Sequence, residues 1–442
     1  MKKTVALVAL VALAAILPPA AAFADGGSIL VKNGTVLTVT KGVIPRGDVL
    51  VVGGVIKAVG ENVAAPPGVR VVDAAGRYVL PGIIDSHTHI ALAGTNEGAD
   101  AITPEADVGS VINADDTAIL TALSGGVTMV HTMHGSANPI GGANVVIKTK
   151  WGRPSEELVV TEALPTLKFA LGENVKQSNR ALQPGQAQRY PATRMGANAI
   201  IRREFERARN YMAQWDRYRK AAAAKNPAAN LVPPRKDLRL EVLAEMLRGE
   251  RVARCHSYQA TESLEFMELA KEFGFKIQCF EHMWEGYKIA DELRAAGIGI
   301  SVFADFWAYK MEAAEGIAEM AGYCHNKGIL VSINSDSGER IRRLFNDAAK
   351  TMKYGGLSED EALRLVTINP AIQLGVDRIV GSLEVGKQGD IAVFSEHPMS
   401  AYTRCDMTII EGDVYFDRDA LVKEREESAA KAAAPGGEGG VS

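Results

Sequence analysis

The sequence predicts an α/β protein in which a (β/α)8 barrel carries a small β domain built from both ends of the chain. Short β-rich runs broken by glycine occupy residues 28–79 and return near the C-terminus at 381–394 and 407–415. Between them, strand-like and helix-like runs alternate, which is typical of parallel strands joined by right-handed crossovers. The chain of 442 residues is also long enough for a barrel plus an accessory domain.

The first 24 residues have the pattern of a secretory signal peptide. Met1-Lys2-Lys3 is basic, Val5 to Leu17 is apolar, and Ala22-Phe23-Ala24 is a small-x-small cleavage site before Asp25. The apolar run is short for a membrane span, and no later stretch is long and apolar enough for one. We therefore expect a secreted protein, periplasmic in a Gram-negative cell, without a membrane span.

The two sets of β runs predict one discontinuous β-sandwich formed from residues 27–80 and 378–425. The barrel is predicted to span 81–377. Its clearest strands are expected at the β-rich runs that precede or follow amphipathic segments: 126–130, 251–256, 276–280, 299–303 and 328–333.

Residues 178–248 are longer than a simple βα connection needs, and from Arg194 they form an arginine-rich helical run. This helical insertion is either a lid that excludes water or recognises anionic substrates, or a solvated surface or subunit contact of a homo-oligomer. The tail at 429–442 has few large apolar residues and is expected to be disordered.

Composition is that of an ordinary globular enzyme, with 47% hydrophobic residues and a net charge of -4. It implies neither a nucleic-acid partner nor a membrane partner. The cysteines are widely spaced and form no Cys-x-x-Cys motif, so we expect buried thiols rather than a disulfide framework. They are Cys255, Cys279, Cys324 and Cys405.

A candidate metal site begins where the run from Pro81 to Ile90 ends in His87-Thr-His89. Alternate residues of a strand point to the same face, so the two imidazoles project together. Neutral imidazole is a common ligand for zinc-like metals. Taken alone, the motif fits an ordinary histidine pair equally well.

Further ligand-type residues stand where later apolar strand runs stop, which is where (β/α)8 barrels carry their chemistry. His256 ends one run, His282 follows the next, and Asp336 follows the run from Val331. Each alone also fits a polar loop residue or, for Asp336, a helix cap. Together they predict a metal centre.

With ligands in this order, the chain resembles the amidohydrolase superfamily from about Ile29 to Asp417, and most closely its imidazolonepropionase-like and prolidase-like members. The resemblance implies a distorted TIM barrel that holds one or two divalent metal ions, with zinc as the expected metal. It further implies that His87 and His89 bind the more buried ion, that His256 and His282 bind the second, and that Asp336 is both ligand and proton shuttle. The motifs that carry it are Val79-Leu-Pro-Gly-Ile-Ile-Asp-Ser-His-Thr-His89, His256, His282, Ser335-Asp-Ser337, Thr367-Ile-Asn-Pro-Ala371 and Gly381-Ser-Leu-Glu-Val-Gly-Lys-Gln-Gly-Asp390.

The bridging ligand that the resemblance implies has two candidates. Lys168, which ends a short apolar run, would bridge as a carbamate, whereas Glu173 supplies a carboxylate five residues later. Lys168 is preferred because a strand end holds a ligand more rigidly than a glycine-flanked loop. If Lys168 is an ordinary lysine, the site is mononuclear.

These ligands predict attack of a metal-bound hydroxide on a carbonyl carbon, with Asp336 acting first as general base and then as general acid. Asp85 and Glu281 are candidates to orient the imidazoles. Four further residues near predicted strand ends are candidate substrate contacts, with an ordinary loop role as the alternative for the two histidines. They are His131, His134, Asp305 and Lys310.

Three functions fit the sequence. The first is hydrolysis of an amide bond in a cyclic amide or a small dipeptide-like substrate. Export favours the dipeptide-like substrate. The second is a metal-dependent lactonase or organophosphate-type esterase, because the same ions serve both reactions. The third is a non-catalytic scaffold, which the retained ligands disfavour.

Overall fold

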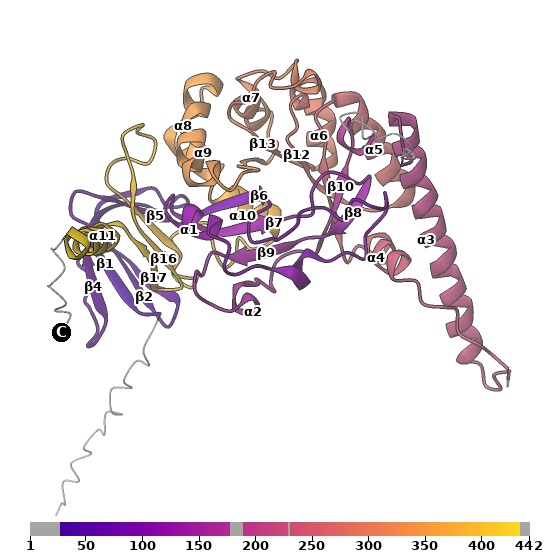
Figure 1. The fold of residues 1–442 in the computed structure, drawn as a ribbon, viewed down its shortest axis with the longest axis horizontal. Helices are drawn as coiled ribbons and strands as arrows, with labels where there is room; N and C mark the ends of the chain where they lie inside the picture. The colour runs from indigo at the N-terminus through magenta and orange to yellow at the C-terminus, as the bar shows by residue number, and fades with distance from the viewer. Residues whose placement is uncertain (1–26, 177–188, 229, 434–442) are drawn as a thin grey trace, which may run out of the picture.

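A computed structural model describes residues 27–176, 189–228 and 230–433. A β-sheet part lies at one end of the molecule, beside a larger α/β part whose helices surround shorter strands (Figure 1). The signal peptide predicted at residues 1–24 lies outside the described residues.

One eight-stranded sheet joins the two ends of the chain, in the order β17-β16-β15-β5-β1-β2-β3 with β4 beside β1. The two halves meet where β15 pairs antiparallel with β5, Ile391 opposite Pro81. The predicted sandwich arrangement stays a prediction, because all eight strands belong to one hydrogen-bonded sheet. The strands are β1 (Ile29–Leu37), β2 (Val43–Val52), β3 (Val55–Gly60), β4 (Arg70–Asp73), β5 (Tyr78–Pro81), β15 (Ile391–Phe394), β16 (Cys405–Ile410) and β17 (Asp413–Asp417).

The α/β part contains the parallel strands that the alternating runs predicted. One group is a sheet in which β10 to β14 are consecutive and parallel, with β8 antiparallel at the edge. The other group is a three-stranded sheet in which β7 pairs parallel with β6 and antiparallel with β9. The Ser86 hydroxyl connects the two groups, 2.8 Å from the Ser301 hydroxyl and 3.0 Å from that of Ser332. Full closure of the barrel stays a prediction. The strands are β6 (Ile83–Thr88), β7 (Val127–Thr132), β8 (Ile140–Ala143), β9 (Val145–Lys148), β10 (Thr166–Ala170), β11 (Val252–His256), β12 (Ile277–Glu281), β13 (Gly299–Val302) and β14 (Val331–Ile333).

Several helices that follow these strands end where the sequence supplies glycine. Gly274, Gly297, Gly356 and Gly375 terminate α5, α6, α8 and α10 with left-handed φ angles of 83°, 65°, 69° and 72°. The helices are α1 (Ala118–Leu123), α2 (Ser155–Leu158), α3 (Arg194–Ala222), α4 (Leu238–Leu247), α5 (Ala260–Phe273), α6 (Ala290–Ala296), α7 (Met320–Asn326), α8 (Leu344–Gly355), α9 (Glu359–Arg364), α10 (Ile368–Leu374) and α11 (Arg418–Ala433), with short 3-10 turns at Val108–Val111, Asn174–Lys176, Gly286–Ile289, Met311–Ala313 and Arg340–Arg343.

The predicted insertion contains α3 and α4, and the start of α3 belongs to the core. Phe205 of α3 stacks on Phe275 at a centroid distance of 4.4 Å, and Phe169 of β10 lies 5.2 Å from Phe266 of α5. The second half of α3 extends beyond the rest of the molecule (Figure 1). Helix α11 reaches Ala433, so residues 429–433 of the predicted tail are helical, while 434–442 lie outside the described residues.

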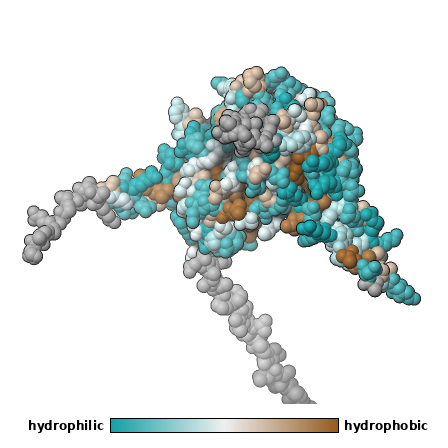
Figure 2. Space-filling model, turned by 45° about the vertical axis from the view of Figure 1, so that its right-hand side comes forward, coloured by the Kyte–Doolittle hydropathy of each residue, from teal (hydrophilic) through white to brown (hydrophobic). Residues whose placement is uncertain are grey.

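The visible face of the surface is mostly hydrophilic, with hydrophobic residues in small separate groups (Figure 2). Among the described residues, no helix has the length and hydropathy needed to cross a membrane. The four cysteines are buried free thiols.

A buried ion pair joins the two parts of the molecule, and we expect it to matter for stability. The Lys148 ammonium of β9 lies 2.7 Å from the Asp390 carboxylate, and both side chains are 3% exposed. Lys148→Met should lower the free energy of unfolding by about 3 kcal/mol, because it leaves a buried carboxylate without its cation. Urea denaturation measures this. Arg70→Gln, which removes an exposed pair with Asp417, is the control and should change stability by less than about 1 kcal/mol. Equal effects of the two variants would contradict the prediction.

Candidate metal centre

Three of the predicted ligands form a compact group at the end of β6. The ligand atoms of His87, His89 and Asp336 lie within 4.8 Å of one another. Asp336 Oδ1 lies 3.1 Å from His89 Nε2 and 3.7 Å from His87 Nε2. His87 is part of β6, and His89 follows one residue after its end, so the strand directs both rings to one side as expected.

The other predicted ligands surround this group. His282 Nε2 lies 3.5 Å from Asp336 Oδ2, and the His256 and His282 rings are 5.2 Å apart. Lys168 donates a hydrogen bond from Nζ to His87 Nε2 at 3.1 Å. Side chains from five strands or strand ends therefore converge, although Lys168 lies in the middle of β10 and not at its end as predicted.

Two of the candidate ligands have a left-handed backbone, which is unusual for residues other than glycine. The φ angle is 57° at His282 and 45° at Asp336. Such conformations cost free energy and are retained mainly where they serve a function. The helix-cap role considered for Asp336 belongs instead to Ser337, whose hydroxyl accepts hydrogen bonds from the amides of Glu339 and Arg340.

Burial keeps the imidazoles in the form that binds metal. Burial lowers the pKa of His282 to about 3 and holds the pKa values of His87 and His256 well below their usual range. Burial also acts to raise the pKa of Asp336, but the neighbouring His282, His89 and Lys168 outweigh it and lower this pKa to about 2. Neutral imidazoles and an ionised carboxylate are a suitable donor set for a divalent transition metal.

Unsatisfied donor atoms also fit a metal ion. Within the described part of the chain, both ring nitrogens of His282 and Nδ1 of His256 are buried without a hydrogen-bond partner. Buried polar atoms are normally paired, so these atoms need a partner that the side chains do not supply. A divalent cation held by His87, His89, His256, His282 and Asp336 would supply a partner for one nitrogen of each ring.

A buried carboxylate orients one of the imidazoles. Glu281 Oε2 lies 3.2 Å from His87 Nδ1, and its Oε1 lies 2.6 Å from the Arg254 guanidinium. Glu281 thus lies within ion-pair distance of the ring that it was predicted to orient, without a hydrogen bond between them. Among the described residues, Asp85 has no hydrogen bond or ion pair with an imidazole ring. It accepts hydrogen bonds from the Ser335 hydroxyl at 2.5 Å and from the amides of His87 and Ser335, so it holds the turn that carries Asp336.

Comparison with known proteins identifies the family. The model of the amidohydrolase family matches residues 204–416. A solved amidohydrolase from Thermotoga maritima is 34% identical, with a TM-score of 0.79 over 88% of this chain and 100% of that chain. The chain belongs to the amidohydrolase family.

Two further relatives extend this comparison. Amidohydrolase tasK of Hapsidospora irregularis is 30% identical over 413 residues, which make up 87% of this chain but 41% of that protein. A solved prolidase in complex with N-methylphosphonate-L-proline covers 88% of this chain with a TM-score of 0.53 and 17% identity, which shows a shared fold only. The prediction of an amidohydrolase is confirmed, and the likeness to the prolidase is one of fold.

The two histidines predicted as substrate contacts have structural roles in this amidohydrolase. His131 is fully buried in β7, where Nδ1 donates to the Ser86 carbonyl at 3.2 Å and Nε2 lies 3.0 Å from the Thr166 hydroxyl. His134 donates from Nδ1 to the Gly135 carbonyl and accepts at Nε2 from the Glu97 amide, both at 2.9 Å. Both nitrogens of each ring are therefore used within the protein. Their contact with substrate stays a prediction that these hydrogen bonds do not support, and the contacts of His134 fit the alternative loop role.

Asp305 and Lys310 occupy different environments. Asp305 pairs with Arg340 and Lys350, each at 2.5 Å, and has no recorded contact with the candidate ligands, so its predicted substrate role has no support in the described structure. Lys310 lies beside the centre: its ammonium is 3.2 Å from Glu173 and 4.2 Å from the centre of the Tyr258 ring. The Tyr258 ring packs edge-on against His256 at 4.7 Å.

Sequence reasoning missed three residues that shape the centre. Arg254 balances Glu281, Tyr258 packs on His256, and Phe303 stacks on His282 with ring centroids 4.5 Å apart. A detectable signal existed only for Arg254, a charge in the middle of an apolar strand run. The aromatic residues carry no such signal.

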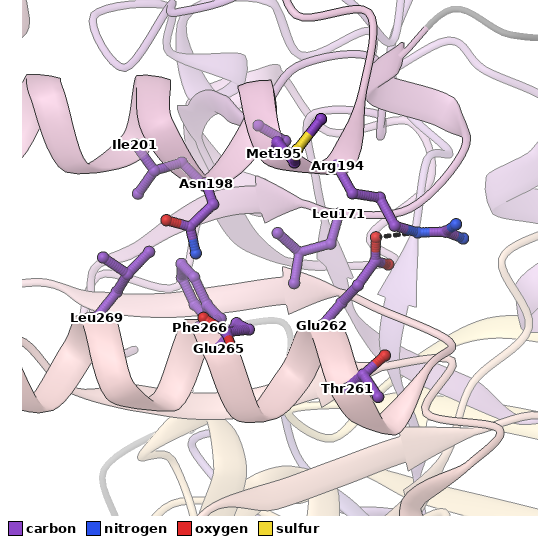
Figure 3. A pocket seen from close by; sticks show the side chains of 11 residues that line it. Leu171, Arg194, Met195, Asn198, Ile201, Thr261, Glu262, Glu265, Phe266 and Leu269 are labelled. Carbon is purple, nitrogen blue, oxygen red and sulfur yellow. Dashed lines mark hydrogen bonds and ion pairs between the residues drawn. The ribbon is translucent and has the colours of Figure 1, made fainter.

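A surface groove lies elsewhere in this amidohydrolase, away from the candidate ligands. It measures about 480 Å³ and separates α3 from α5, with Leu171 between them and an ion pair of Arg194 and Glu262 at one end (Figure 3). None of the candidate metal ligands lines it. The groove is therefore separate from the candidate metal centre.

The arrangement predicts the metal content of the purified protein. Elemental analysis should find between one and two equivalents of a divalent transition metal per chain, with zinc expected from the histidine-rich donor set. Lys168→Ala should lose one equivalent if Lys168 bridges two ions. The matched variant Glu173→Ala should keep its metal, because Glu173 pairs with Lys310. Loss of metal in Glu173→Ala alone would move the bridge to Glu173.

Proposed function

We propose that this protein is a metal-dependent hydrolase that cleaves an amide bond in a cyclic amide or a small peptide-like substrate. The observation that carries the proposal is the convergence of His87, His89, His282 and Lys168 around the carboxylate of Asp336. Membership of the amidohydrolase family supports it. The chain spans 41% of the length of the relative from Hapsidospora irregularis.

A divalent ion supplies an acidified water ligand and polarises a carbonyl group when it is bound. The protein contributes the proton transfer. Asp336 Oδ1 and Oδ2 face His89 and His282, and its side chain is 30% exposed, so the carboxylate is open toward the substrate side. It would take a proton from the attacking water and return it to the leaving nitrogen.

Lys168 is the proposed bridging residue. It is fully buried, and burial lowers its pKa to about 8, so part of the population carries a neutral amine near neutral pH. The neutral amine is the form that adds carbon dioxide to become a carbamate. In that form Lys168 would offer two oxygens beside His87.

Residue Asp336 provides the test of this mechanism. Asp336→Asn keeps the size and an oxygen ligand but removes the base, so turnover should fall by roughly a hundredfold or more while metal content is largely kept. Activity is measured on the best substrate from a screen of dipeptides, N-acyl amino acids, cyclic amides and lactones with metal-reconstituted protein. Asp291→Asn, an exposed residue paired with Lys327, is the control and should keep wild-type turnover. Near wild-type turnover of Asp336→Asn would refute the mechanism, and turnover of lactones without amides would refute the substrate class.

Export is part of the proposal, since small peptides are available outside the cytoplasm. It rests on the basic, apolar and small-residue pattern of the first 24 residues. N-terminal sequencing of protein recovered from the periplasm or medium of the expressing cell should begin at Asp25. Recovery of full-length protein in the cytoplasm alone would contradict this part of the proposal.

A further inference from the structure

We propose that Arg189 is a positioning residue for the metal centre, because it holds together two loops, one of which begins at Met133, the hydrogen-bond partner of His89. The inference rests on the proposed function, in which His89 is a metal ligand. Arg189 belongs to the predicted helical insertion, five residues before α3 begins, and the proposal links it to the candidate metal centre.

The guanidinium of Arg189 reaches two loops that are distant in sequence. Nη1 donates to the carbonyls of Gly98 at 2.6 Å and Asp100 at 2.7 Å, and to the Asn138 side-chain oxygen at 3.0 Å. Nη2 donates to the Ala137 carbonyl at 2.5 Å. A planar fork with several fixed donors can hold such a set of acceptors, which a single ammonium group cannot do.

The two loops are also bonded to each other. The Gly135 amide donates to the Thr95 carbonyl at 2.6 Å, and the Asn138 side chain donates to the Glu97 carbonyl at 2.7 Å. The Glu97 amide donates to Nε2 of His134 at 2.9 Å. Arg189 therefore closes a hydrogen-bond network between residues 95–100 and 134–138, and the second of these segments follows directly after Met133.

This network ends at a candidate ligand. His89 donates from Nδ1 to the Met133 carbonyl at 2.7 Å, which fixes the tautomer and leaves the lone pair of Nε2 facing Asp336. His89 lies just outside β6, and its side chain is 24% exposed, whereas that of His87 is fully buried. Its orientation therefore depends on the loop more than that of His87, which is held inside the strand.

Another arginine of the same insertion serves as a matched control. Arg202 pairs with Glu272, and both side chains are exposed by 40% or more. Over the residues that the structure describes, this pair has no hydrogen bond or ion pair with a candidate ligand. Removing its charge should change the net charge of the insertion by the same amount as removing that of Arg189. A difference between the two variants then reports on the loops and not on charge.

The test is metal affinity, measured by competition between the protein and a chromophoric zinc chelator. Arg189→Met should bind Zn²⁺ about tenfold more weakly, the lower end of the loss expected when support of a ligand is removed. Arg189→Lys should fall between Arg189→Met and wild type, and Arg202→Met should match wild type. The visible spectrum of the Co²⁺-loaded protein should change in Arg189→Met, because the geometry at His89 changes.

The outcomes separate the two proposals. If wild-type protein binds no metal, the proposed function fails. If wild type binds metal and Arg189→Met binds it with unchanged affinity and an unchanged Co²⁺ spectrum, the role of Arg189 is overturned, even if its melting temperature falls. If Arg189→Met does not fold, Arg189→Lys decides, because wild-type affinity in that variant would overturn the role of the fork.

Discussion

Burial of uncharged imidazoles around one ionised carboxylate is the constraint on which the centre depends. His87, His256 and His282 are at most 2% exposed, and several of their ring nitrogens lack a hydrogen-bond partner among the described residues. An unsatisfied buried polar atom costs roughly 1–3 kcal/mol. The packing that buries these rings therefore leaves nitrogens that a bound cation would satisfy. Metal binding would then stabilise the folded protein, which couples binding to folding.

The strands alone do not direct these groups at one point. His87 and His256 lie at or near the ends of parallel strands and Lys168 lies in the middle of one. His282 and Asp336 lie beyond their strands and have left-handed backbone conformations. Asp85 holds the second of these turns through Ser335. The strain at these two positions is thus maintained by packing and by a buried hydrogen bond.

The positions of the candidate ligands could be predicted because residue type and strand-end position are both local information, while their role as ligands stays a prediction. His87, His89, His256, His282 and Asp336 all lie where they were expected. His131 lies in the interior and not at the rim, because β7 extends to Thr132, two residues beyond the predicted run. The partners of His134 and His89 lie 37 and 44 residues away in the chain, and no local pattern reveals such contacts.

Charge balance explains why a lysine can belong to this centre. Lys168 and Arg254 are buried cations beside two carboxylates, the buried Glu281 and the partly exposed Asp336, so the charges of these four groups nearly cancel before any ion binds. An ammonium group 3.1 Å from His87 Nε2 competes with a metal ion for the same lone pair and repels it. Addition of carbon dioxide, with release of two protons, changes Lys168 from one positive to one negative charge, which offsets one divalent ion. Glu173 offers no such change, because its carboxylate already neutralises Lys310. The proposal that Lys168 is the bridge therefore follows from electrostatics as well as from position.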